Sequence, residues 1–453
     1  MARSATTNSA SVLIFAFEIH ANLFRRLKMP FWRPKKSTEN EVGQLPPPDV
    51  FEKSGDEPFQ AAKVLEELGE TRDLAAILKV LDVHLDEIQQ DGFGEYAREL
   101  VLWADAQFKE QNYPSSYRAL LAGVYHRLEG TDPAKNLLRA VELYREALEQ
   151  CQEAGEEEGV AVILNNLGNT YLELGAIKPA YFRQAIPVLE EAVEFFRDVG
   201  EASHRAFISM SLGEAYAGLQ EEGPDHFEIA RENYERAWAL FERGQSWLEL
   251  GHAQGRLGDV QFELGAFYGP GALEKAVRHY RNALTVFVEQ NQPDLCGLYQ
   301  SRLAEAYINL SNMESEHLQK GLRAYERALD MFKKSDDEVA LADTCMEMGR
   351  LHQVLKDEDQ NMHLEKAVER YVQALQIYRE LGLLRQQGGA LQGLARVYLE
   401  AGGKSATEDI TQAIQFLEEA AQIYQRENCI VEFQTIESEL QQARQMLEIS
   451  PAG

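Results

Sequence analysis

Residues 159–200 read GVAVILNNLGNTYLELGAIKPAYFRQAIPVLEEAVEFFRDVG, and this stretch decides the fold. It contains two helical patterns, separated by a break that runs from glycine to proline at residues 175–179. In the first pattern, Tyr171 follows the pair Leu167 and Gly168 by three residues. Apolar spacings of three and four predict two amphipathic helices. The marks of the second helix are Ala185, Leu189, Ala192 and Phe196.

The same marks recur along the chain with a nearly constant step. The small residue of the Leu-Gly pair advances by 45 or 46 residues each time, and the second-helix alanine at position 185 keeps the same step. A period held over seven copies is the signature of a stacked repeat array, so we predict an all-α solenoid of antiparallel helix pairs. The other pairs are Leu121-Ala122, Leu212-Gly213, Leu257-Gly258, Leu303-Ala304, Met348-Gly349 and Leu394-Ala395.

The array has predicted limits. Residues 111–427 hold the seven repeats, and residues 51–110 are predicted to form a helical cap followed by a degenerate opening repeat. Residues 428–449 are predicted to form a closing helix, because an array needs a helix with a polar outer face to cover its exposed end. This helix places Ile430, Phe433, Leu440 and Leu447 on one face.

Residues 1–50 differ from the repeats. Residues 1–36 carry seven basic residues and one acidic residue, and three consecutive prolines follow at positions 46–48. The apolar run at residues 11–17 is too short for a membrane span, which needs about 20 residues. We interpret the region as a disordered basic leader with a linker. The alternative is an amphipathic anchor for an anionic membrane, using Phe24, Phe31 and Trp32.

Glycine in the middle of a helix needs an explanation, because it costs up to about 1 kcal/mol relative to alanine. Gly168, Gly213, Gly258 and Gly349 all occupy this position. We predict that a partner helix approaches closely there and presents its own small residues, such as Ala185 and Ala192. The repeated tyrosines are predicted to fill the core against these small residues.

Composition limits the classes of function. The net charge of −29 argues against nucleic acid as a partner, because phosphate binding needs a basic surface. The four cysteines lie more than forty residues apart, without metal-ligand spacing, which predicts buried reduced thiols in a cytoplasmic protein. No nucleotide-binding loop, metal-binding histidine pair or nucleophile elbow is found, so we expect no catalysis, no cofactor and no metal.

The pattern Leu-Gly-x-x-Tyr, followed by Ala-x-x-x-Tyr-x-x-Ala-x-x-x-Phe, resembles the tetratricopeptide repeat (TPR) family. The resemblance covers roughly residues 94–427. This chain departs from the family in its longer period, since the usual unit has 34 residues, and in lacking an early tryptophan. The resemblance implies a right-handed superhelix whose concave wall is formed by the first helix of each repeat.

The resemblance also implies which positions face that concave groove: two residues before the repeated leucine, directly before it, and two residues after it. The alternative for Arg256 with Asp259, and for Arg302 with Glu305, is an ion pair at i,i+3 on a solvated helix face. The predicted groove residues are Asn165, Asn166, Asn169, Glu214, Arg256, Asp259, Arg302, Glu305, Arg350 and Arg396.

These observations predict a non-catalytic scaffold that binds a peptide or helical segment of a partner protein in the groove. The acidic charge favours a basic segment as the ligand. A different hypothesis is a regulatory or sensor module that self-associates or docks to a separately encoded effector. A third is an assembly factor recruited to a membrane through residues 1–36.

Overall fold

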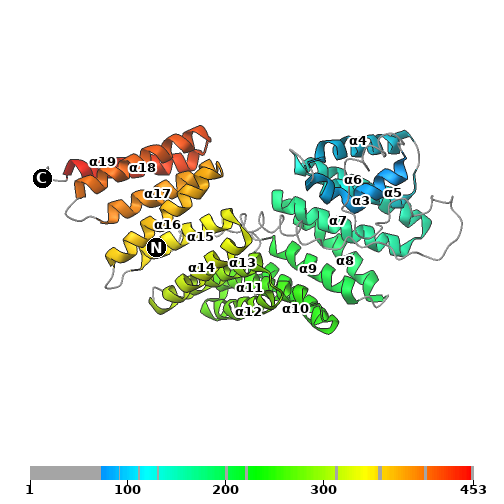
Figure 1. Ribbon diagram of the computed structural model, residues 1–453. Coiled ribbons are helices and arrows are strands. Elements are labelled where there is room, and N and C mark those ends of the chain that lie inside the picture. Colours follow the sequence, from blue (N-terminus) through cyan, green and yellow to red (C-terminus); the bar gives the residue numbers. More distant parts are fainter. Residues whose placement is uncertain are drawn as a thin grey trace. The chain divides into compact units, whose positions relative to one another are not determined.

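The computed structural model describes residues 73–90, 92–110, 113–129, 132–198, 202–219, 223–311, 315–355, 360–401 and 406–449. Within these ranges the chain forms 17 α-helices and one short 3₁₀ helix, without any strand (Figure 1). The predictions made for the leader, the linker and residues 51–72 lie outside the described residues. None of the described helices is long and apolar enough to cross a membrane.

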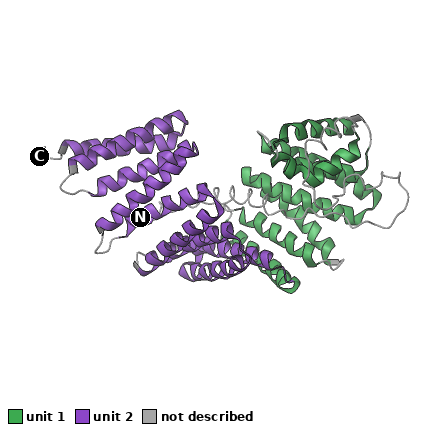
Figure 2. Ribbon diagram, in the orientation of Figure 1, with its two compact units in different colours: residues 1–244 green, residues 245–453 purple. Residues whose placement is uncertain are grey.

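The chain divides into two compact units, residues 1–244 and residues 245–453 (Figure 2). The described helices of the first unit are α3 (Leu74–Gln90), α4 (Gly94–Glu110), α5 (Ser115–Arg127), α6 (Pro133–Ala154), α7 (Glu157–Ile177), η2 (Pro179–Tyr181), α8 (Phe182–Asp198), α9 (Ala202–Ala217) and α10 (Pro224–Gly244). Those of the second unit are α11 (Trp247–Tyr268), α12 (Pro270–Glu289), α13 (Pro293–Leu310), α14 (Ser315–Ser335), α15 (Glu338–Val354), α16 (Gln360–Glu380), α17 (Leu384–Ala401), α18 (Ala406–Arg426) and α19 (Ile430–Ile449).

Within each unit the helices pack as a stack of pairs. The first helix of each repeat packs against the second helix of the same repeat, as α5 does on α6 and α11 on α12. The second helix then packs against the next repeat, as α6 does on α7 and α12 on α13. First helices also contact one another, α7 with α9 in the first unit and α11 with α13 in the second. The predicted all-α solenoid is confirmed.

The mid-helix glycines lie where a second helix approaches closely, as predicted. A Cβ atom built on Gly258 would lie 2.5 Å from the ring of Tyr280, and one on Gly213 would lie 2.5 Å from the ring of Tyr234. The partner was predicted wrongly, however. The repeated large side chain of the second helix, and not its alanine, fills the space above each glycine.

Six of the second helices, α6, α10, α12, α14, α16 and α18, are followed within two residues by a left-handed residue that recurs with the repeat. Gly155 and Gly382 have φ values of 72° and 70°, which glycine adopts without a steric penalty. The same position holds non-glycine residues elsewhere, where a left-handed conformation is strained. Those residues are Gln245 (φ 55°), Asn291 (φ 51°), Asp336 (φ 56°) and Asn428 (φ 54°).

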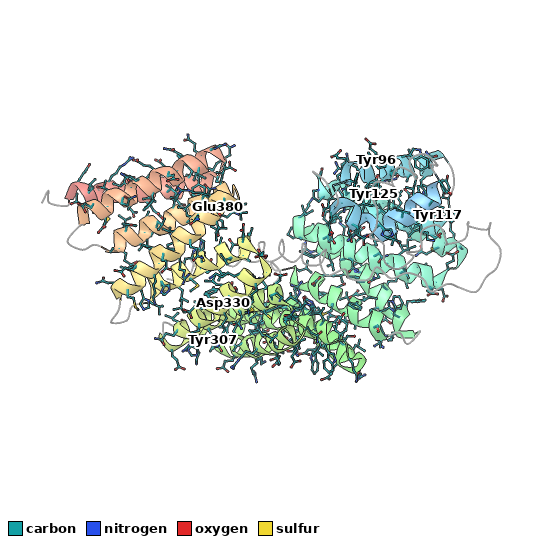
Figure 3. The ribbon with its side chains drawn as sticks, in the orientation of Figure 1. Tyr96, Tyr117, Tyr125, Tyr307, Asp330 and Glu380 are labelled. Carbon is teal, nitrogen blue, oxygen red and sulfur yellow. The ribbon has the colours of Figure 1, made fainter. Side chains whose placement is uncertain are left out.

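The opening of the array is joined by a buried polar cluster. The Tyr125 hydroxyl, labelled in Figure 3, donates a hydrogen bond of 3.1 Å to Asp105. Arg139 donates to both oxygens of the same carboxylate, at 2.6 and 3.0 Å. Asp105 lies on α4, Tyr125 on α5 and Arg139 on α6, so three successive helices share this one carboxylate.

At the other end, α19 packs against α18 and buries Ile436, Leu440 and Ala443. The prediction for Ile430 was wrong, because its side chain is 68% exposed at the first residue of the helix. The cysteines are free thiols, and three of them are buried, whereas Cys429 is only half-buried.

Candidate functional site

All ten predicted groove residues lie on first helices of repeats, but these helices belong to different units. The first unit holds Asn165, Asn166 and Asn169 on α7, and Glu214 on α9. The second unit holds the other six, on α11, α13, α15 and α17.

In the first unit the predicted residues mainly join neighbouring helices. Asn166 and Glu214 are buried, with 8% and 6% of their surface exposed, so little of either is open to a ligand. Asn169 accepts a hydrogen bond of 2.8 Å from the hydroxyl of Ser211, which links α7 to α9. Asn165 is half-buried. This set does not form a continuous exposed surface.

Another cluster in the first unit brings together a hydroxyl, an imidazole and a carboxylate, which are the groups of the catalytic triad in many hydrolases. The imidazole of His126 lies 2.9 Å from Thr170 Oγ1 and 2.8 Å from a carboxylate oxygen of Glu173. Thr170 is fully buried, however, and its hydroxyl donates to the backbone oxygen of Asn166. A substrate carbonyl has no access to this hydroxyl, so we assign the cluster to the packing of α5 on α7.

In the second unit, Arg396 on α17 is joined to the closing helix. Its guanidinium forms an ion pair of 2.6 Å with Glu439 of α19. Gln392 donates to the same carboxylate oxygen at 2.9 Å. Arg396 therefore already has an anionic partner within its own unit.

The remaining predicted residues lie together on α11, α13 and α15. Arg256 lies 3.8 Å from Asp259, and Arg302 lies 3.1 Å from Glu305, so both i,i+3 ion pairs that the sequence offered are present. Arg302 also lies 4.0 Å from Asp259, which connects α13 to α11. The charged groups therefore interact across helices as well as along them.

The third helix of this set continues the pattern with the order of charges reversed. Glu347 precedes Arg350 on α15, and the two form an ion pair. One turn earlier, Asp343 accepts a hydrogen bond of 2.6 Å from the hydroxyl of Tyr378. The other oxygen of Asp343 is buried without a hydrogen-bond partner.

We call this set the charged face. It has five carboxylates and three guanidiniums, and most of these side chains are only partly exposed. Its members are Arg256, Asp259 and Glu263 on α11, Arg302 and Glu305 on α13, and Asp343, Glu347 and Arg350 on α15.

Burial disfavours the ionised form of several carboxyl groups on this face. It raises the pKa of Glu263 to about 7, with Arg302 opposing the change and Asp259 and Glu305 adding to it. It raises the pKa of Asp343 to about 6, although the hydrogen bond from Tyr378 acts in the opposite direction. The pKa values of Asp259 and Glu347 are also raised by burial. The three arginines of the face do not fully compensate the burial of these four carboxyl groups.

Glu347 lies directly before the repeated Met348, at a predicted groove position, although the ten predicted residues do not include it. Two further residues of the face escaped the sequence prediction. Glu263 lies one helical turn after Asp259, and Asp343 lies one turn before Glu347. Side chains four residues apart share a helix face, so extending each predicted position by one turn identifies both. The predicted positions came from the family resemblance, which does not include them.

No protein-family model matches the chain, and a search of curated proteins finds no match. Solved structures do match. The apo form of RapI covers 83% of this chain and 99% of its own, at 13% identity and a TM-score of 0.48. A kinesin-light-chain-like protein with TPR-like repeats from Podospora anserina covers 48% of this chain and 94% of its own, at 16% identity and a TM-score of 0.37. A signal-transduction ATPase with a tetratricopeptide repeat sensor from Pyrococcus horikoshii covers 76% of this chain and 54% of its own, at 14% identity and a TM-score of 0.45.

These neighbours are TPR-like repeat proteins, the class that the repeat motif indicated. At such identities and TM-scores the likeness concerns the repeat fold alone. The choice of ligand and site rests on the residues of this chain.

Proposed function

We propose that the chain is a non-catalytic scaffold whose charged face binds a basic segment of another protein. The observation that carries the proposal is the excess of carboxylates over guanidiniums on α11, α13 and α15. A cationic side chain placed among them adds the opposite charge that the arginines do not supply.

The energetics favour a cation more than the count of charges alone suggests. A carboxyl group whose pKa is raised by burial is held in an unfavourable environment when it is ionised. A lysine or arginine nearby stabilises the ionised form, and this interaction is stronger at a partly desolvated site than in bulk water. Glu263 is the clearest case, since its pKa is about 7 and no ion pair or hydrogen bond joins it to a described residue.

The net charge of the whole chain supports the same choice of partner. A molecule with a net charge of −29 attracts basic segments over a distance of about one Debye length, roughly 8 Å at physiological salt. This attraction raises the rate of encounter, while the local arrangement of charges determines the bound position. We expect binding to weaken as salt concentration rises.

The experiment is an affinity capture from the source cells with three forms of the full chain. The parent is compared with a face variant that combines Asp259→Asn, Glu305→Gln and Glu347→Gln. A control variant makes the same change in net charge on exposed residues of second helices, with Glu274→Gln on α12, Glu326→Gln on α14 and Glu365→Gln on α16.

The proposal predicts a partner that the parent and the control capture and the folded face variant loses. Circular dichroism verifies that all three forms are helical. If both variants retain the same partners, binding takes place elsewhere on the chain, and the proposal is wrong.

A further inference from the structure

Two second helices of the second unit carry more basic than acidic residues. Helix α12 has three lysines and arginines against two acidic residues, and α14 has five against three. The other second helices of this unit, α16 and α18, have three against three and one against four. The excess of cations therefore lies on α12 and α14, in a chain whose net charge is −29.

The basic residues of these two helices recur with the repeat. Lys320 follows Lys275 by 45 residues, and Arg323 follows Arg278 by the same step. Helix α13 packs against both α12 and α14, so equivalent residues of the two helices lie in adjoining layers of the stack (Figure 1). We call the exposed basic residues of α12 and α14 the basic patch, and they are Lys275, Arg278, Arg281, Arg323, Arg327, Lys333 and Lys334.

The side chains of the basic patch have no partner within the described part of the chain. No ion pair or hydrogen bond joins any of them to another described residue. The arginines of α17, which also has more basic than acidic residues, differ in this respect, because Arg385 pairs with Glu432 and Arg396 with Glu439. An anionic ligand can therefore pair with the basic patch without displacing an internal partner.

The acidic residues near the basic patch favour one class of anionic ligand. Glu274, Glu326 and Asp330, of which Figure 3 labels the last, are exposed on the same two helices. A nucleic acid or polyphosphate chain carries negative charge at every unit, so it places phosphates against these carboxylates as well as against the cations. A polypeptide can instead place acidic side chains opposite the arginines and uncharged ones opposite the carboxylates.

We infer that α12 and α14 form a second docking surface, and that its ligand is a short acidic segment of another protein. Arg278 and Arg323, at equivalent positions of successive repeats, make its main ion pairs. The inference does not depend on the function proposed above, because second helices carry the basic patch and first helices carry the charged face. The net charge of the chain opposes the approach of any dense polyanion, which also favours a short segment.

The test is fluorescence anisotropy of a labelled peptide of four Glu-Glu-Ser units with the full chain at low ionic strength. The patch variant combines Arg278→Gln, Arg281→Gln and Arg323→Gln. Circular dichroism verifies that the variants are helical. A control variant makes the same change in net charge at exposed arginines of α8, α10 and α19, with Arg197→Gln, Arg236→Gln and Arg444→Gln.

We expect the patch variant to bind the peptide about tenfold less tightly than the parent, because three exposed ion pairs are lost. The control variant is expected to stay within about twofold of the parent. Equal losses in the two variants would show that only the net charge matters. That result, or no detectable binding to the parent, overturns the inference and leaves the proposed basic ligand of the charged face unaffected.

Inorganic polyphosphate with the same number of charges tests the class of ligand. We expect it to bind the parent less tightly than the peptide does, since its charges are dense and continuous. Tighter binding of polyphosphate, lost in the patch variant, would assign the basic patch to phosphate chains and overturn the choice of a protein segment.

Removing the neighbouring carboxylates tests the location from the opposite direction. Glu274→Gln combined with Glu326→Gln is expected to strengthen peptide binding by about twofold, because exposed carboxylates beside the basic patch repel the peptide. Glu365→Gln combined with Glu408→Gln, on α16 and α18, is the matched control and should change the affinity less. The same gain in both double variants contradicts the location.

Discussion

At the residue scale, the mid-helix glycines are required by large side chains that are distant in the sequence. The ring of Tyr280 lies where the Cβ of residue 258 would be, and its hydroxyl donates a 3.0 Å hydrogen bond to Asp259. The tyrosine is therefore held both by packing and by this bond. It cannot move away without losing the hydrogen bond.

Gly258→Ala tests this account. We expect the variant to lower the free energy of unfolding by about 1–3 kcal/mol, because the added methyl group overlaps the ring of Tyr280. Gly271→Ala is the matched control, since no atom lies within 4 Å of its Cβ position on α12. There the helix propensity of alanine should leave stability equal or higher. Equal midpoints of thermal unfolding for the two variants would contradict the account.

A pair of buried histidines gives a prediction for pH. His352 on α15 and His363 on α16 are 2% and 6% exposed, and their Nδ1 atoms lie 3.1 Å apart. Burial lowers the pKa of His352 from 6.5 to about 4, and the neighbouring His363, Lys366 and Arg370 add to this effect. The folded protein thus binds a proton at this site less readily than the unfolded chain.

The sign follows from that difference. Above pH 6.5 the imidazole of His352 is neutral in both the folded and the unfolded state. As the pH falls from about 6.5 toward 4, the unfolded chain binds a proton that the folded protein does not, and the free energy of unfolding decreases. The shift corresponds to a loss on the order of 3 kcal/mol. His352→Asn removes the titrating group, so its stability should fall less over this range than that of the parent. Parallel stability curves, measured by urea unfolding at several pH values, would rule out this role.

The same residues show what sequence can and cannot predict at this scale. The glycine pattern predicted a close approach, because no other reason for mid-helix glycine was evident. It could not identify Tyr280 as the cause, since the register of facing helices is set by packing. Gly255 lies two residues before the repeated Leu257, which is one of the positions that the resemblance assigns to the groove. A Cβ there would lie 2.1 Å from the Tyr299 hydroxyl, so the neighbouring repeat covers it.

At the element scale, a left-handed residue follows the end of six second helices. Glycine fits this conformation, and asparagine tolerates it better than other residues do. Gln245 has neither advantage at φ 55°. The helical periodicity of the sequence predicted where these helices lie, but the recurring left-handed residue is visible in the sequence only where glycine occupies it.

Gln245→Gly should therefore raise the free energy of unfolding, by about 0.5–1 kcal/mol, once the greater flexibility of glycine in the unfolded chain is included. Asn291→Gly, at the equivalent position of the next repeat, is expected to change it much less. Thermal unfolding of both variants measures the difference. A lower midpoint for Gln245→Gly would show that the glutamine side chain stabilises the turn through other contacts.

At the scale of the whole molecule, a uniform repeat period produces two compact units. The step of 45 or 46 residues continues unchanged across residues 244 and 245, so the period alone does not reveal the division. Composition had a similar limit. It predicted an acidic protein with a basic partner, but the location of the partly buried carboxyl groups depends on which first helices lie side by side.

The overall charge also creates a difficulty for any binding test, because a chain with net charge −29 attracts every lysine peptide to some extent. Proton release distinguishes the charged face from this general attraction. Exposed carboxylates are already ionised at pH 7 and release nothing when a cation binds. Glu263, with a pKa of about 7, is only about half ionised there, and a bound cation favours its ionised form.

The most direct measurement is isothermal titration calorimetry of a lysine peptide, Lys-Gly-Ser-Lys-Gly-Ser-Lys, into the full chain at pH 7, in buffers of different ionisation enthalpy. We predict release of up to about half a proton per bound peptide, mostly lost in Glu263→Gln and retained in the exposed control Glu365→Gln. Binding without proton release, or the same release from both variants, would contradict the assignment of binding to the charged face.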